Sequence, residues 1–276
     1  MDNAIDLPPN ASAMVESMRD IGYSFPAAIA DIVDNSISAN ARRIAINFIW
    51  NDGDPTLAII DDGEGMDAVS LLEAMRPGTQ GPHSERSTND LGRFGLGLKT
   101  ASFSQCRRLS VVSRHDGCEV TGYRWDLDYI AETNSWSIQS LSSKAIAELR
   151  FRELLGERGT LVVWEKIDRL MDFTSQRAED LFNDHFDEAR EHLQLVFHRF
   201  LEPMADEKNS PRVHIEMNGL ALEAFNPFFP DAHARQMLVT EDIPVNGSYV
   251  RIQPYVLPHH SRVGKEAYER YAGKDG

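Results

Sequence analysis

The chain has 276 residues, which is enough for one large domain or for one domain and part of a second. Its 43 acidic and 28 basic residues give a formal net charge of −15, which disfavours unaided binding to nucleic acid. Two cysteines exclude a disulfide framework and a four-cysteine zinc site. The acidic N-terminus is unlike a signal peptide, and no apolar run reaches the roughly 20 residues that cross a bilayer, so we expect a cytoplasmic protein without membrane contact.

The first part of the chain predicts three helices and two strands before a long polar segment. Asn10 can cap the first helix and Gly22 can end it, while Asp67 can cap the third. Residues 77–92 are rich in Gly, Pro, Ser, Thr and Asn, which predicts a long mobile loop, and such loops are usually functional or disordered. The expected elements are helices at 10–21, 26–40 and 67–75 and strands at 43–50 and 56–60.

The remainder predicts further strands and a long amphipathic helix. The residue order favours an α+β fold, a two-layer α/β sandwich whose mixed, antiparallel-rich sheet carries helices on one face. We expect a first domain at 1–225 and the beginning of a second α/β domain at 226–276. The expected elements are helices at 98–105 and 175–201, strands at 109–114, 119–125, 135–140 and 159–165, a strand pair at 213–216 and 220–225, and new strands at Val239 and 249–256.

The first motif lies on the second predicted helix. Asp31, Asp34 and Asn35 share one helical face, and the apolar residues around Ile32 share the other. An amide oxygen suits Mg²⁺, and a carboxylate one turn away can orient and deprotonate a water molecule. The alternative interpretation is a solvated polar face or a helix cap.

The second motif is Asp61-Asp62-Gly63-Glu64-Gly65-Met66, directly after an apolar strand. A carboxylate followed by Gly-x-Gly lets the backbone approach a flat ligand, and Asp61 can accept a hydrogen bond from an exocyclic amine. An acidic turn between a strand and a helix is the simpler alternative. The dinucleotide pattern Gly-x-Gly-x-x-Ala also fits, but the two preceding acids and the missing strand–helix alternation disfavour it.

The third motif is a glycine-rich turn at residues 92–102. Gly92, Gly95 and Gly97 free backbone N–H groups to face phosphates at the start of a helix. Lys99 adds a full positive charge and Thr100 a hydroxyl. The spacing of a P-loop is absent, and a purely structural glycine turn is the alternative.

In this order and spacing, the three motifs resemble the gyrase, chaperone, histidine kinase and MutL (GHKL) family of ATP-binding domains, with the Bergerat fold, across about residues 10–225. The Gly-Leu-Lys-Thr ending is similar to the Microrchidia-type branch. The resemblance implies that Asn35 coordinates Mg²⁺, that Asp61 reads the adenine amine, that Thr160 supports Asp61, and that residues 77–92 form an ATP lid. The ATP-binding residues that it implies are Asn35, Asp61, Gly63, Gly65, Met66, Gly92, Arg93, Phe94, Gly95, Leu96, Gly97, Leu98, Lys99, Thr100 and Thr160.

One departure from the family concerns catalysis. Most hydrolysing members carry glutamate where this chain has Asp31, whose carboxylate is one methylene shorter. Because the reach of a general base matters steeply, we expect a slow ATPase with Asp31 as the water-orienting base, helped by Asp34.

The resemblance implies an ATP-driven conformational or dimerisation switch, with ATP and Mg²⁺ as cofactors, an ATP-dependent homodimer, and DNA or protein clients bound through other regions. The expected second domain resembles the beginning of the family's transducer domain. The alternatives are a non-hydrolysing ATP sensor, an ATP-dependent chaperone and a histidine kinase, although residues 1–25 lack the histidine that such a kinase needs. The nine histidines form no recognisable metal site, and His259 and His260, expected in a strand, should point apart.

Overall fold

The computed structural model describes residues 7, 9–78, 97–203, 212–229, 235–245 and 247–272. The chain divides into two compact units, Met1–Glu223 and Ala224–Gly276, and each is described by itself. Among the residues that the structure describes, no helix combines the length and the apolar character that crossing a membrane requires.

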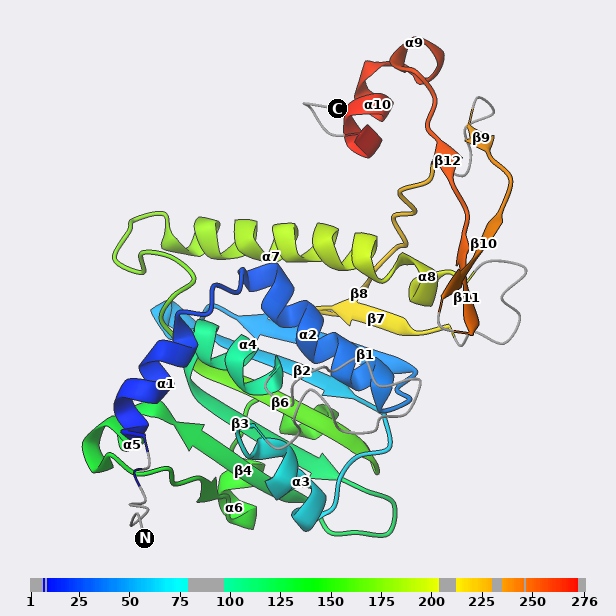
Figure 1. The fold of residues 1–276 in the computed structure, drawn as a ribbon. Helices are drawn as coiled ribbons and strands as arrows, with labels where there is room; N and C mark the ends of the chain where they lie inside the picture. The colour runs from blue at the N-terminus through cyan, green and yellow to red at the C-terminus, as the bar shows by residue number, and fades with distance from the viewer. Residues whose placement is uncertain are drawn as a thin grey trace, which may run out of the picture. The chain divides into compact units, whose positions relative to one another are not determined.

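The first unit is built on an eight-stranded sheet (Figure 1). The strand order is β5-β4-β3-β6-β2-β1-β7-β8, and every neighbouring pair is antiparallel except β1 with β7. The predicted two-layer α/β sandwich with a mixed, antiparallel-rich sheet is therefore confirmed. The strands are β1 (Arg43–Ile49), β2 (Thr56–Asp61), β3 (Cys106–Arg114), β4 (Thr121–Asp126), β5 (Gln139–Ser140), β6 (Gly159–Ile167), β7 (His214–Met217) and β8 (Leu220–Ala221).

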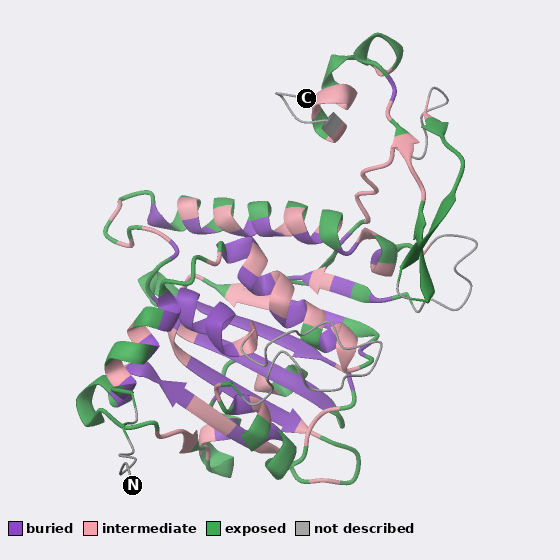
Figure 2. Cartoon of the chain, viewed as in Figure 1, coloured by how far each residue is buried: buried purple, intermediate pink, exposed green. Residues whose placement is uncertain are grey.

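Helices pack over one face of this sheet. Trp164 of β6 donates its indole N–H to Ser102 Oγ at 2.9 Å, and its ring meets Phe25 edge-on at a centroid distance of 6.5 Å. Phe48 of β1 stacks on Phe186 at 3.5 Å. These contacts form the buried core between the two layers, coloured purple in Figure 2. The helices of this layer are α1 (Ala11–Arg19), α2 (Phe25–Ser38), α3 (Ala68–Met75), α4 (Gly97–Gln105) and α7 (Ala178–Val196).

A smaller apolar cluster covers part of the opposite face of the sheet. Ala58 and Val163 are register partners, and both point away from the face that carries Trp164, because successive side chains of a strand alternate. They pack with α6 (Ser143–Ala147) and with residues that flank the short 3₁₀ turn η2 (Arg152–Leu154). The sheet is thus covered by helices over one face and by a short segment over part of the other.

Most helix boundaries follow from visible caps. Asn10 Oδ1 accepts from Ala13 N at 2.9 Å, and Asp67 Oδ1 accepts from Ser70 N at 2.8 Å, so both predicted caps are confirmed. Ser24 caps α2 and Pro26 lies in its first turn, where the missing N–H costs no helical hydrogen bond.

Three predictions in this unit need correction, and one helix was not predicted. The helix expected at 175–201 is two helices, α7 and α8 (His198–Leu201), because Phe197 has non-helical angles of φ −102° and ψ 14°. The strand expected at 135–140 contains only β5, and the strand expected at 220–225 contains only β8. The helix α5 (Leu127–Thr133) was not predicted; the Asp126 side chain caps it, and Asn134 ends it in the left-handed region.

The described residues of the second unit form two small antiparallel sheets and two helices. The predicted strand at Val239 is wrong, because this residue lies between β9 and β10. His259 caps α9 instead of lying in a strand, so its ring faces that of His260 at a centroid distance of 3.9 Å, which corrects the expectation that the two point apart. The elements are β9 (Gln236–Met237), β10 (Glu241–Val245), β11 (Ser248–Ile252), β12 (Tyr255–Val256), α9 (His260–Val263) and α10 (Lys265–Ala272).

Candidate nucleotide-binding site

Asp61 ends the central strand β2, and its carboxylate is held by three donors. Oδ1 accepts from Gly63 N at 2.9 Å and from Thr160 N at 3.2 Å, and Oδ2 accepts from Ser36 Oγ at 2.9 Å. The residue is 7% exposed, and this burial raises the pKa of the carboxyl group, although the three hydrogen bonds oppose that rise. A carboxylate oxygen has two acceptor positions, so the bond from Ser36 leaves Oδ2 with one further position.

Two glycines are required by close backbone packing around Asp61. Gly65 has φ +67°, and a Cβ there would lie 1.9 Å from the carbonyl oxygen of Arg114. Gly159 has φ +122°, and its Cβ would lie 1.9 Å from the carbonyl oxygen of Asp61. Gly65 of the second motif therefore has a structural reason inside the protein, in addition to the approach to a ligand that the sequence suggested.

A chain of hydroxyl groups joins Met66, the last residue of the second motif, to strand β6. Ser113 Oγ donates to the carbonyl of Gly159 at 3.0 Å and accepts from Met66 N at 2.9 Å. The Thr160 hydroxyl lies 2.9 Å from the same oxygen. Thr160 therefore supports Asp61 through its backbone N–H, while its side chain is bound to Ser113.

The polar face of α2 turns toward the beginning of α4. Asp31 and Asp34 are half-buried on this face and Asn35 is exposed. A Cβ at Gly97, the first residue of α4, would lie 3.4 Å from Asp31 Oδ2. Burial, and next the charge of Asp31, raise the pKa of Asp34. The two acids are therefore electrostatically coupled beside α4.

The third motif is described only in part. Gly92, Arg93, Phe94, Gly95 and Leu96, with most of the expected lid, lie outside the described residues. Gly97, Leu98, Lys99 and Thr100 form the first turn of α4.

Lys99 is buried within this first turn and is bound to the protein. Its Nζ donates to the carbonyl oxygen of Ala74, near the end of α3, at 2.8 Å. Burial lowers the pKa of the ammonium group from 10.5 to about 8. One of the three N–H donors of Lys99 is therefore used inside the protein.

Sequence reasoning missed three hydroxyl groups of the site: those of Tyr23, Ser36 and Ser113. The Tyr23 hydroxyl donates to Asp31 Oδ2 at 2.7 Å. Ser36 follows the Asp34-Asn35 pair and lies on the buried face of α2, and Ser113 ends the apolar stretch of β3. A buried polar residue at the end of an apolar strand was the one available signal for Ser113.

The structure also bears on two other candidate sites. The paired arginines at the start of β3 are neutralised, because Arg107 Nε lies 2.6 Å from Asp128 and Arg108 lies 2.9 Å from Asp126. Their charges are thus bound within the protein and are not free for phosphate groups. In the described parts of the chain, no three His, Cys, Asp or Glu residues are grouped to hold a metal ion.

Comparisons with known proteins identify the family. Residues 23–158 match the family described as histidine kinase-, DNA gyrase B- and HSP90-like ATPase. ATPase morc-1 of Caenorhabditis elegans is 37% identical over 91 residues, which cover 33% of this chain and 10% of that protein. The DNA mismatch repair protein MutL of Dictyoglomus turgidum is 30% identical over 112 residues, covering 40% of this chain and 19% of that protein. The human structural maintenance of chromosomes flexible hinge domain-containing protein 1 is 30% identical over 141 residues, covering 40% of this chain and 7% of that protein.

The fold is a two-layer sandwich in which the end of a central strand and one helix face carry neighbouring polar groups. The chain belongs to the GHKL ATPase family, and its relatives are consistent with the Microrchidia-type branch. Membership of this family implies ATP binding. The matched segments make up a fifth or less of the length of these curated relatives.

Proposed function

We propose that this chain binds Mg²⁺-ATP beside Asp61, hydrolyses it slowly and acts as an ATP-driven conformational or dimerisation switch. The observation that carries the proposal is the Asp61 carboxylate, which is buried, fixed by two backbone N–H groups and left with an acceptor position on Oδ2. An exocyclic amine is a donor, so the adenine amine suits that position. A nucleobase without an exocyclic amine leaves the buried Asp61 carboxylate without its partner and binds weakly.

Asn35 is the proposed protein ligand of Mg²⁺. Its amide is exposed on the same face of α2 as Asp31, one turn further along the helix. Mg²⁺ prefers oxygen ligands and is commonly held by one or two protein groups together with substrate phosphates and water. The donor set therefore fits this ion, which when bound neutralises phosphate charge and polarises the phosphoryl oxygens.

Asp31 is the proposed base of the hydrolysis step. Its carboxylate lies beside the start of α4, where a helix N-terminus favours negatively charged groups such as phosphate. The carboxylate accepts a proton from a water molecule, whose oxygen attacks the γ-phosphorus as the bond to the bridging oxygen of ADP breaks. The shorter side chain of aspartate supports slow turnover.

The switch rests on the family and on the beginning of a second unit. We infer that the segment 226–276 acts as the start of a transducer-like domain and that bound ATP promotes a homodimer. The proposal includes DNA or protein clients and action in the cytoplasm, and a chaperone-like role is its alternative. These are proposals about a whole protein, because the chain spans a small part of its curated relatives.

Calorimetric titration with ATP and with a non-hydrolysable analogue, with and without Mg²⁺, tests the binding part. We expect magnesium-dependent binding that weakens in Asn35→Ala, and phosphate release that falls to a small residual rate in Asp31→Asn while ATP still binds. Absence of binding at millimolar ATP would overturn the proposal. Binding without phosphate release would favour a non-hydrolysing ATP sensor, for which the short Asp31 is the supporting feature.

A further inference from the structure

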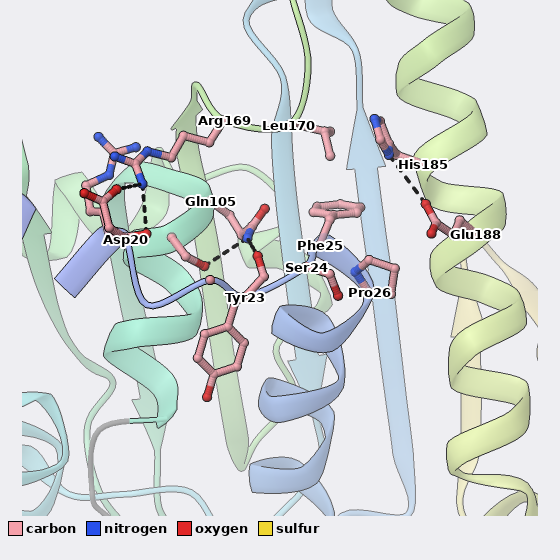
Figure 3. A pocket seen from close by; sticks show the side chains of 13 residues that line it. Asp20, Tyr23, Ser24, Phe25, Pro26, Gln105, Arg169, Leu170, His185 and Glu188 are labelled. Carbon is pink, nitrogen blue, oxygen red and sulfur yellow. Dashed lines mark hydrogen bonds and ion pairs between the residues drawn. The ribbon is translucent and has the colours of Figure 1, made fainter. Parts of the chain in front are cut away.

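Tyr23 lies in the link between α1 and α2, and its phenol contacts the proposed base. The hydroxyl donates to Asp31 Oδ2 at 2.7 Å and also interacts with the hydroxyl of Thr100 in the first turn of α4. Figure 3 shows the ring of Tyr23 between the ribbons of α2 and α4. The phenol thus joins Asp31 to the helix that follows the glycine-rich turn.

The backbone of Tyr23 is held by the opposite end of the same helix. Gln105, the last residue of α4, donates from Nε2 to the carbonyl oxygen of Tyr23 at 3.2 Å, and its amide is fixed by Ser104 Oγ at 2.9 Å (Figure 3). Tyr23, Ser104 and Gln105 line a pocket of about 480 Å³ at the N-terminal end of α2. Tyr23 is therefore bound to both ends of α4, and its ring has little freedom to leave Asp31.

This arrangement suits a base that is one methylene shorter than glutamate. A single hydrogen bond on Oδ2 fixes the orientation of the carboxylate and leaves Oδ1 to accept the proton of water. Burial, and next the bond to Asp31, raise the pKa of the Tyr23 phenol, so the hydroxyl stays protonated and acts as a donor at neutral pH.

We propose that Tyr23 is a positioning residue for ATP hydrolysis. Its phenol holds the Asp31 carboxylate and couples the orientation of this general base to the position of α4. The inference rests on the proposed hydrolysis. Tyr23 itself exchanges no proton in the step: water gives its proton to Asp31 Oδ1, and the phenol donates to Oδ2 throughout. Loss of the phenol hydroxyl therefore impairs turnover and leaves the binding of ATP intact.

The first test compares Tyr23→Phe with the matched control Tyr123→Phe. Tyr123 also loses a phenol hydroxyl, but its bond is a 3.4 Å contact with the carbonyl of Ala68, away from Asp31. We expect kcat to fall about 10-fold in Tyr23→Phe, because a misoriented base loses part of its catalytic effect, with the Kd for ATP within about twofold of the wild type. The control is expected to keep both values.

A double-mutant cycle separates positioning from a structural role. In an Asp31→Asn background, Tyr23→Phe should cause no further loss of turnover, because the carboxylate that the phenol orients is gone. Additive losses, or an unchanged kcat in Tyr23→Phe while Asp31→Asn is strongly impaired, would overturn the inference and leave the proposed function standing. A wild-type protein that binds ATP without turnover would overturn both.

A spectroscopic measurement tests the contact without ATP. The ¹³Cζ signal of Tyr23, among the seven tyrosines of a labelled protein, can be assigned sequentially and followed through its pH titration. In Asp31→Asn the titration should move to lower pH, because the hydrogen bond to Asp31 and its charge both raise the pKa of the phenol. A Tyr23 titration that is the same in both proteins would show that the contact is absent in solution, and this holds even where Tyr23→Phe fails to fold.

Discussion

The two carboxylates of the site, Asp61 and Asp31, are held in different ways. Asp61 is buried at the end of a central strand, and two of its three donors are backbone N–H groups. Asp31 is half-buried on a helix, and its carboxylate accepts a hydrogen bond from the side chain of Tyr23. The backbone of the sheet therefore fixes one carboxylate, whereas side chains between two helices fix the other.

This difference suggests that the two carboxylates have different roles, one in binding and one in hydrolysis. A carboxylate fixed by the sheet offers the same acceptor geometry with or without ligand, which suits recognition of the adenine ring. A carboxylate fixed by side chains changes its orientation when α2 and α4 shift against each other. We infer that changes near Asp61 act on ATP affinity, whereas changes near Asp31 act on turnover.

Asp61→Asn should give the largest effect. The asparagine oxygen can still accept from Gly63 N and Thr160 N, so the fold should survive, but the nitrogen that replaces Oδ2 cannot accept the adenine amine. We expect ATP affinity to fall on the order of 1,000-fold, or about 4 kcal/mol, because a buried donor then faces a donor. Calorimetry measures the affinity, and near-ultraviolet circular dichroism checks the fold.

The matched control is Asp62→Asn, the same chemical change at the next residue. Asp62 Oδ1 accepts from the backbone N–H groups of Arg42 and Arg43 at 2.7 and 2.9 Å, and an asparagine oxygen can keep these bonds. Equal losses of affinity in the two variants would contradict a specific role for Asp61 in reading the base.

Lys99→Met should reveal the buried ammonium group through the pH dependence of stability. The pKa of Lys99 is about 8 in the folded protein and about 10.4 in an unfolded chain, so the unfolded state binds more protons between these values. The free energy of unfolding of the wild type should therefore rise relative to Lys99→Met as pH increases from 8 to 10.5. The full relative gain is about 3 kcal/mol.

Urea denaturation of both proteins at pH 7.5, 9 and 10.5 measures this difference, and other titrating groups cancel between them. A difference that stays constant over this range would mean that the Lys99 ammonium is solvated rather than buried.

Much of the fold could be predicted from the sequence, because its signals are local. Asn10 and Asp67 mark helix starts through cap chemistry, and the apolar residues of β1 and β2 leave little choice of element. The break at Phe197 carries no proline or glycine, so no local signal announces it. The seven-residue helix α5 is too short to show a clear period, and Asp126 caps it from the end of a strand.

The site was predictable to the extent that its residues lie in motifs. Asp31, Asn35 and Asp61 stand out by spacing, whereas Ser36 does not, because a serine on the buried side of a helix is common. Its partner depends on how α2 packs on β2, which is a tertiary fact. Likewise Thr160 reaches Asp61 only through the register of β2 with β6, 99 residues apart in sequence.

Ser36→Ala should give a smaller effect and tests whether the third donor of Asp61 matters. Burial raises the pKa of Asp61, and the Ser36 hydroxyl opposes that rise, so its removal leaves a buried carboxylate less well satisfied. We expect the unfolding free energy to fall by about 1–2 kcal/mol and ATP affinity by about fivefold. Ser17→Ala is the matched control. Ser36 Oγ lies 3.3 Å from the carbonyl oxygen of Ile32, four residues earlier, and Ser17 Oγ makes the corresponding bond to Ala13 at 2.9 Å but faces solvent on α1. If both variants lose the same stability, the loss comes from the helix, and the two backbone donors alone hold Asp61.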